Sequence, residues 1–416
     1  MAVIFVHGVN NRIDDADYET RRLVTEQFLQ RHLTGAAING KTLTAPKPVF
    51  PYWGDLGVTF RWNMKSLPSG EMEALGPGVP SEMRPLVAAV RDALNQPGAA
   101  KDQPLLSLAK HSFPRAVELV AELVVQTSTK ANAAEASQFA IDAQTYALDF
   151  DAPDPKQPPP PPAWLAGLTT DEQFYGRLLQ EVQAKSQAQP GSQALGGMLG
   201  KVTGLVAQGA AKLKQATKQV GQKILDTTGD YASTKVLGWS RESLNGTLGR
   251  FFGDVFMYLH ERGEKATPGP IPQRLLGEWD KAIAATPGEP VVIIGHSLGG
   301  VISYDLLTHF RPDLNVDLFV SIGSQVPHFE EMKLFRASPA DIPGPGGDKV
   351  DKPGNLTHWI NVFDEVDIFS YSCKDIFAGV HDYPYDTKTY VVKAHGAYFA
   401  QARFYERLRK RIDDLP

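Results

Sequence analysis

The stretch Val291-Val292-Ile293-Ile294-Gly295-His296-Ser297-Leu298-Gly299-Gly300 decides the fold of this chain. A short apolar run is followed by a serine set between glycines, and apolar residues at helical spacing come next. A serine at the junction of a buried strand and a helix can be held in a strained turn that exposes its hydroxyl. The pattern therefore predicts a strand, a sharp turn and a helix, with Ser297 as a candidate nucleophile.

Length and composition narrow the class of protein. The chain has 416 residues, 42% of them hydrophobic, one cysteine and a formal net charge of −5. This is enough material for one large domain or two ordinary ones. A single cysteine excludes an internal disulfide, so we expect a reduced, cytoplasmic setting. The small negative charge gives no reason to expect nucleic acid as a partner.

The amino terminus and the hydropathy pattern give no targeting or spanning signal. Residues 1–8 are apolar but lack a basic region before them, so they predict a strand and no signal peptide. No apolar stretch reaches the length that a membrane-spanning helix needs. We therefore expect a soluble protein, and leave open peripheral membrane association or export without a signal peptide.

Strands and amphipathic helices alternate in the first and last parts of the chain. We expect helices after Asp17, from Ile271 and after Ser297, and a last helix from Ala397 to Arg411. The expected strands are at 3–6, 48–53, 291–294, 316–322, 359–363 and 389–392. Apolar runs this continuous predict an α/β fold with a mostly parallel sheet and helices on both faces. Ligands of such sheets bind beyond the carboxyl ends of the strands, where the loops carrying His7, Gly54, Ser297, Asp367 and His395 should open.

The middle of the chain has a different composition, rich in Ala, Gln, Gly and Pro. It predicts a large, mainly helical insertion at 61–249, a cap or lid, between core segments 1–60 and 250–416. A proline-rich spacer occupies 153–162. Segment 201–225 carries lysines and one stripe of small and apolar residues: Val202, Val206, Gly209, Leu213 and Ala216. A basic amphipathic helix can contact an anionic membrane surface, but the small residues favour packing inside the insertion.

A serine hydroxyl needs a base within hydrogen-bonding reach and an acid that orients the base. The order expected in this type of sheet is serine, acid, histidine. His395 is the preferred base because it follows a predicted strand and precedes the last helix, and His381 is its competitor. Asp367 is the preferred acid because an apolar pair follows it, while Asp364 is the alternative nearer the strand end.

The developing oxyanion needs preorganised N–H donors. We expect one from Leu298, directly after the serine, and one from Gly8 or Val9 after the first strand. His7 should orient that loop. Ser303, Ser321 and Ser324 lack a glycine-flanked turn and are expected to be structural. No metal or organic cofactor is expected, since His381, Asp382 and Asp386 do not have a spacing that compels a metal site.

Together these motifs resemble the α/β-hydrolases of the lipase and serine-esterase type. The resemblance rests on Phe5–Val9, Gly295–Gly300, Ser321–Ser324, Asn361–Asp367 and His395–Tyr398. It implies a Ser297-Asp367-His395 triad that cleaves carboxylic esters, of lipid type, through an acyl-enzyme on Ser297.

The resemblance covers the two core segments and not the insertion. The chain departs from the family in that its first strand begins at residue 2 and its insertion precedes the nucleophile strand. Thioesterases, acyltransferases and amidases share this triad, and a non-catalytic interaction protein on the same fold also stays open.

Overall fold

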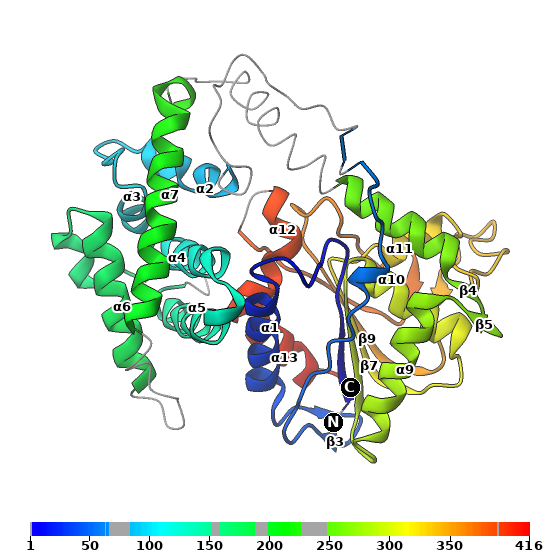
Figure 1. Ribbon diagram of the computed structural model, residues 1–416. Coiled ribbons are helices and arrows are strands. Elements are labelled where there is room, and N and C mark those ends of the chain that lie inside the picture. The colour runs from blue at the N-terminus through cyan, green and yellow to red at the C-terminus, as the bar shows by residue number, and fades with distance from the viewer. Residues whose placement is uncertain are drawn as a thin grey trace.

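A computed structural model describes residues 2–62, 64–65, 84–151, 159–187, 199–225, 248–388 and 391–416. A parallel sheet lies on one side of the molecule and a group of helices on the other, with α1 and α13 between them (Figure 1). Most of the predicted spacer at 153–162 lies outside the described residues, as do residues 389–390 of the last predicted strand.

In the described part of the chain the central sheet has five parallel strands in the order β1-β6-β7-β9-β11. Their bounds are Ala2–Val6, Val291–His296, Val316–Ile322, Leu356–Phe363 and His381–Pro384. Three short two-stranded pairs lie outside it: β2 Ala37–Ile38 with β3 Lys41–Thr42, β4 Gly263–Glu264 with β5 Thr267–Pro268, and β8 Val350–Asp351 with β10 Phe377–Ala378. Because the strands of the central sheet are parallel, the loops that follow them meet at one edge.

Helices cover both faces of the sheet, which explains the continuous apolar strands. Alternate residues of β1 point to opposite sides: Val3 and Phe5 belong to one hydrophobic core, Ile4 and Val6 to the other. The first core contains α1 Tyr18–Leu33 and α13 Ala402–Asp413, and the second contains residues 248–261, α9 Pro270–Ala284 and α10 Leu298–Asp305. A π-helical turn, Leu306–Phe310, extends α10, and α11 Val326–Glu331 follows β7.

The described residues of the insertion are mainly helical. They form α2 Arg84–Leu94, α3 Pro104–His111, α4 Phe113–Thr127, α5 Ala133–Ala147, α6 Asp171–Gln187 and α7 Leu199–Leu225, with short 3-10 turns at Lys130–Asn132, Leu148–Phe150 and Ala163–Gly167. These helices share one hydrophobic core with α1, α13 and a face of the sheet. The insertion is thus packed into the protein through α1 (Figure 1).

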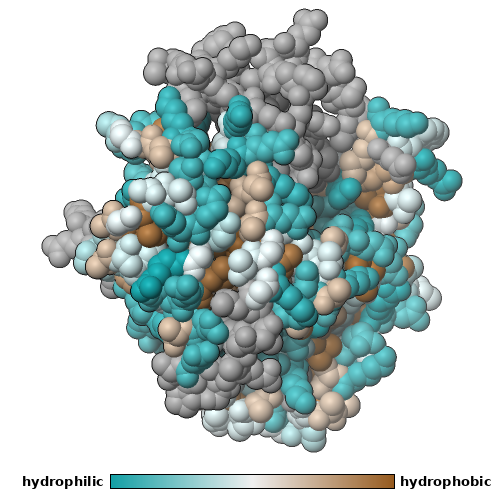
Figure 2. All heavy atoms as spheres, turned by 60° about the vertical axis from the view of Figure 1, so that its left-hand side comes forward, coloured by the Kyte–Doolittle hydropathy of each residue, from teal (hydrophilic) through white to brown (hydrophobic). Residues whose placement is uncertain are grey.

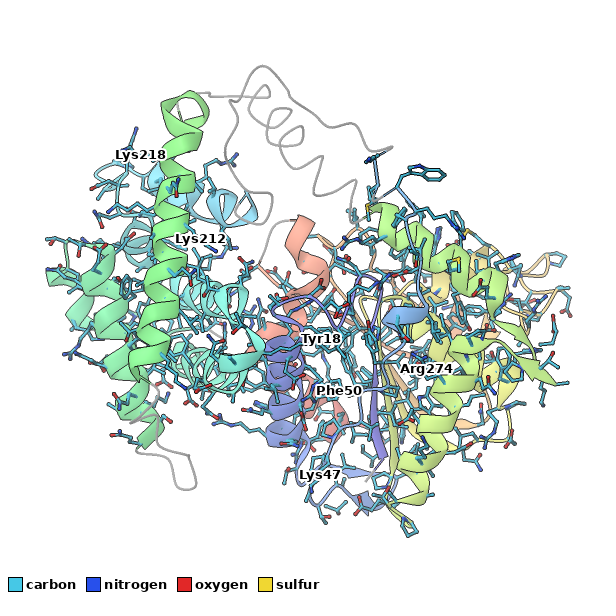
Figure 3. All side chains as sticks on the ribbon, viewed as in Figure 1. Tyr18, Lys47, Phe50, Lys212, Lys218 and Arg274 are labelled. Carbon is cyan, nitrogen blue, oxygen red and sulfur yellow. The ribbon has the colours of Figure 1, made fainter. Side chains whose placement is uncertain are left out.

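The apolar stripe of α7 packs inward, as its small residues indicated. Val202, Val206, Leu213 and Ala216 are buried, and a Cβ at Gly209 would lie 2.8 Å from Leu123 Cβ of α4. Lys212 and Lys218 project from the other side of α7 (Figure 3), and hydrophilic residues predominate on the face shown in Figure 2. Among the described helices, none is both long and apolar enough to cross a membrane.

Three expectations about secondary structure are wrong. Residues 48–53 form no strand, since only Val49 bridges to Ile4 and prolines interrupt the pairing on both sides. Val391 and Val392, the described residues of the strand predicted at 389–392, begin instead the helix α12 Val391–Ala397. The last predicted helix, 397–411, is divided by a 3-10 turn at Tyr398–Ala400 into the end of α12 and α13.

Candidate active site

Ser297 occupies a strained turn between β6 and α10. Its φ of +54° and ψ of −130° lie where non-glycine residues are rarely found, at a cost of about 1–3 kcal/mol. The Ser297 N–H donates to the Ile322 carbonyl of β7 at 3.0 Å, and the Ser324 hydroxyl donates to the Ser297 carbonyl at 2.9 Å. The neighbouring strand therefore holds the strain in place.

The structure brings the three predicted side chains into one hydrogen-bonded row. Ser297 Oγ lies 2.7 Å from His395 Nε2, and His395 Nδ1 lies 3.0 and 2.9 Å from the two carboxylate oxygens of Asp367. In this arrangement Nδ1–H donates to Asp367 and Nε2 accepts the serine proton. Ser297 is fully buried.

Asp367 and Asp364 have separate roles. The Asp367 carboxylate also accepts hydrogen bonds from the Phe369 N–H at 3.0 Å and the Tyr398 hydroxyl at 3.2 Å. Asp364 instead accepts from the N–H and the hydroxyl of Thr387, at 2.9 and 2.6 Å, and from the Val366 N–H at 2.9 Å. The alternative acid therefore anchors the segment that leads to α12 and does not contact His395.

His395 is carried by a helix, contrary to its prediction as a residue just past a strand. His296 helps to hold it: its Nε2–H donates to the His395 carbonyl at 2.7 Å, and the two rings lie 4.8 Å apart. Burial holds the pKa of His296 well below its usual range, which keeps this ring neutral. The sequence assigned no role to His296, and this contact was missed.

The predicted oxyanion loop lies against the serine. A Cβ on Gly8 would be 2.6 Å from Ser297 Cβ, so only glycine permits the approach that is seen. Leu298 is the first residue of α10, and such an N–H has no acceptor within its own helix. The backbone hydrogen bonds among the described residues include none donated by Gly8, Val9 or Leu298. These N–H groups are those that the oxyanion prediction requires.

His7 orients this loop, as expected. The Trp53 N–H donates to His7 Nε2 at 3.2 Å, and His7 Nδ1–H donates to the Gly8 carbonyl at 2.8 Å. The His7 and Trp53 rings stack at 4.8 Å. Burial lowers the pKa of His7 to about 4, so the ring is neutral at neutral pH. His7 is thus a structural support of the loop.

Asp254 is a further support that sequence reasoning missed. It is fully buried and pairs with Arg12 at 2.8 Å, while accepting from the N–H groups of Asn10 at 3.2 Å and Val58 at 2.7 Å. Asn11 in turn donates to the carbonyls of Gly8 and Val9. Since more than 240 residues separate Asp254 from Arg12 and Asn10, no local sequence pattern could have linked them.

The remaining candidates lie apart from this row. His381 is in β11, 6.5 Å from the ring of His358, and Asp382 accepts hydrogen bonds from Asn361, Ser372 and Lys374. Over the described residues, no group of three or more His, Cys, Asp or Glu side chains is arranged to hold a metal ion. Ser303, Ser321 and Ser324 all bond to neighbouring backbone or side-chain oxygens: Gly299, Asn361 and Ser297.

Comparison with protein-family models, with curated protein sequences and with solved structures gives no match for this chain. The assignment of a function therefore rests on the residues and geometry described above.

Proposed function

We propose that this chain is a serine hydrolase of the α/β-hydrolase type, related in its site to lipases and serine esterases, and that it cleaves carboxylic esters. The observation that carries the proposal is the row from Ser297 Oγ through His395 to Asp367, with both contacts of the histidine within 3.0 Å. A nucleophile, a base and an orienting acid in such contact are the parts that acyl transfer requires.

The reaction follows from this geometry. Ser297 Oγ attacks the ester carbonyl while its proton passes to His395 Nε2, and the new C–O bond makes a tetrahedral oxyanion. The N–H groups of Leu298 and of Gly8 or Val9 stabilise this charge. His395 then protonates the leaving alcohol as the C–O bond to it breaks, which leaves the acyl group on Ser297. Water, deprotonated by His395, hydrolyses that acyl-enzyme by the same steps.

The strained turn supports the assignment of Ser297 rather than another serine. Ser303, Ser321 and Ser324 have ordinary partners within the core, whereas Ser297, alone among the serines in the described part of the chain, combines positive φ with a hydrogen bond to a histidine. Strain of this kind collects at functional sites because surrounding structure must maintain it. A non-catalytic scaffold would have no physical reason to retain it.

In this proposal the insertion supports the segment that carries His395, in addition to acting as a cap. Asp151, in the insertion, pairs with Lys388 at 3.1 Å and Arg403 at 3.0 Å, which lie before and after the helix that carries His395. Arg115 of α4 also donates to the Lys388 carbonyl. The insertion thus holds both ends of the segment around α12.

Labelling with a fluorophosphonate tests the proposal directly, since the reagent forms a covalent bond with an activated serine. Folded wild-type protein should label, and Ser297→Ala and His395→Ala should not, while Ser303→Ala should label as the wild type does. Absence of labelling in the wild type would contradict the proposed enzyme activity. Labelling of Ser297→Ala would contradict the choice of Ser297 as the nucleophile. Turnover of oxygen esters against thioesters and amides separates the esterase from the alternatives with the same triad.

A further inference from the structure

A cavity of about 290 Å³ lies where the insertion meets the segments before and after α12. Its walls come from the end of α3, the start of α4, the residues after α5, and the segments that carry Lys388 and Arg403. The charged side chains in these walls are Lys110, Arg115, Glu118, Asp151, Lys388 and Arg403. The described lining residues do not include Ser297, Asp367 or His395, so the cavity is separate from the candidate active site.

The cations in this cavity outnumber the carboxylates that pair with them. Asp151, a single carboxylate, is shared by Lys388 at 3.1 Å and Arg403 at 3.0 Å. Lys110 and Arg115 donate hydrogen bonds to backbone carbonyls, and in the described part of the chain neither has a carboxylate partner. An anion is the ligand that would supply the missing counter-charge, and guanidinium groups match the geometry of oxyanions closely.

Glu118, one turn after Arg115 on α4, is the unpaired carboxyl group of the cavity. Among the described residues it makes no hydrogen bond and no ion pair. Burial raises the pKa of Glu118 to about 7. The titratable groups that face it are Arg115 on its own helix, Asp151 after α5, Lys388 before α12, and Tyr385 and Arg403. Since about half of the Glu118 carboxyls carry a proton at neutral pH, their O–H groups can donate to an anion.

We propose that this cavity binds a small, doubly charged oxyanion of the phosphate or sulfate type, and that Glu118 takes up a proton as the ion binds. Phe113 and Phe150 form part of the wall, so the oxyanion can be free or belong to an organic phosphate. An ion between Arg115 of the insertion and the residues that flank α12 would hold the insertion against the segment that carries His395.

Isothermal titration with sulfate tests this binding on the full-length protein, and does not depend on the proposed hydrolysis. Sulfate stays a dianion at neutral pH, and chloride keeps the ionic strength constant. We expect saturable binding by the wild type at pH 6, and a loss of affinity of about tenfold in Arg115→Gln, which removes one charge-assisted contact. Arg177→Gln removes an exposed arginine of α6 outside the cavity, and should bind sulfate as the wild type does.

The pH dependence of binding tests the part played by Glu118. The protonated fraction of this carboxyl falls from about 0.9 at pH 6 to about 0.1 at pH 8, so the Kd for sulfate should rise about tenfold. Glu118→Gln cannot ionise, and should bind sulfate at pH 8 about tenfold more tightly than the wild type. A gain in affinity cannot come from a failure to fold. His111→Gln removes the histidine of the same wall, and should keep the wild-type pH dependence.

Three results would overturn the inference: no saturable binding of sulfate by the wild type at pH 6, binding that Arg115→Gln leaves unchanged, or an affinity in the wild type that does not vary with pH. Titration with inorganic phosphate and with phenyl phosphate at one pH then distinguishes the two sources of the oxyanion. Equal affinities indicate a free ion, and tighter binding of phenyl phosphate indicates an organic phosphate that contacts the aromatic wall.

Discussion

Replacement of Gly8 by alanine tests the closeness of the oxyanion loop to the nucleophile. The added Cβ would lie 2.6 Å from Ser297 Cβ and 3.0 Å from the His296 carbonyl oxygen. Carbon atoms pack at about 3.5–4.0 Å, so one side must retreat by about 1 Å. Ser297 is held by the sheet through Ile322 and Ser324, and we therefore expect the loop at Gly8 to move.

On the proposed mechanism, a shift of this size would withdraw an oxyanion donor. We expect kcat for a soluble ester to fall by about 10²–10³, the usual effect of losing one such donor, and the free energy of unfolding to fall by about 1–3 kcal/mol. Ester kinetics and urea denaturation measure the two effects. Gly277→Ala is the matched control: nothing lies within 4 Å of its added Cβ in α9, so stability should rise by about 0.5–1 kcal/mol with kcat unchanged.

A mild effect of Gly8→Ala would contradict the close approach of the loop to Ser297. If Gly8→Ala keeps kcat within about threefold while its urea midpoint stays that of the wild type, the added Cβ has met no obstacle. Gly8 would then not lie against Ser297, and the oxyanion assignment would lose its support.

Three further predictions rest on single contacts. Asp367→Asn should lower kcat by about 10⁴ because it favours the wrong histidine tautomer, whereas Asp364→Asn should mainly lower the urea midpoint; equal kinetic losses would contradict the assignment of the acid. Gly209→Ala, which brings a Cβ within 2.8 Å of the helix opposite, should destabilise by about 1–3 kcal/mol, while Gly204→Ala, with nothing within 4 Å, should stabilise; parallel effects would be inconsistent with close packing. Because burial lowers the pKa of His7 to about 4 from 6.5, the unfolded chain binds its proton first as pH falls; stability should drop by about 3 kcal/mol between pH 6.5 and 4, and His7→Gln should reduce that drop in urea titrations at each pH.

The sequence was sufficient for the parts of the site that depend on local pattern. The apolar run, the glycines and the helix after Ser297 are contiguous, so the strand-turn-helix could be predicted from one window. The order of acid and histidine was also predictable, and the apolar pair after Asp367 favoured it over Asp364. Both follow β9, and their contacts distinguish them: Asp367 contacts His395, and Asp364 contacts Thr387.

The strand predicted at 389–392 shows where local propensity misleads. Thr, Tyr and Val are enriched in strands, but this preference depends on the surroundings, and Val391 and Val392 lie in α12. Here β11 already pairs with β9 upstream, at His381–Pro384, and the Tyr385 N–H donates once more to the Phe363 carbonyl. β9 thus has its outer partner upstream of Val391, and His395 lies on α12.

The insertion is the part that the sequence could least explain, and the packing gives it a physical purpose. Its helices share a core with α1, so removing the insertion would expose the apolar face of α1 that these helices now cover. Its Asp151 also binds Lys388 and Arg403 around α12, while the helix that follows the insertion returns Asp254 to the oxyanion loop. The segment that carries the candidate base is therefore braced from the insertion, and the proposed oxyanion loop is braced from the helix that follows the insertion. Asp254 belongs to the core segment that follows the insertion, but the contacts of Asp151 lie within it. A segment that only covered the proposed site would not need the Asp151 contacts, and we therefore propose that the insertion also positions the segment that carries the candidate base.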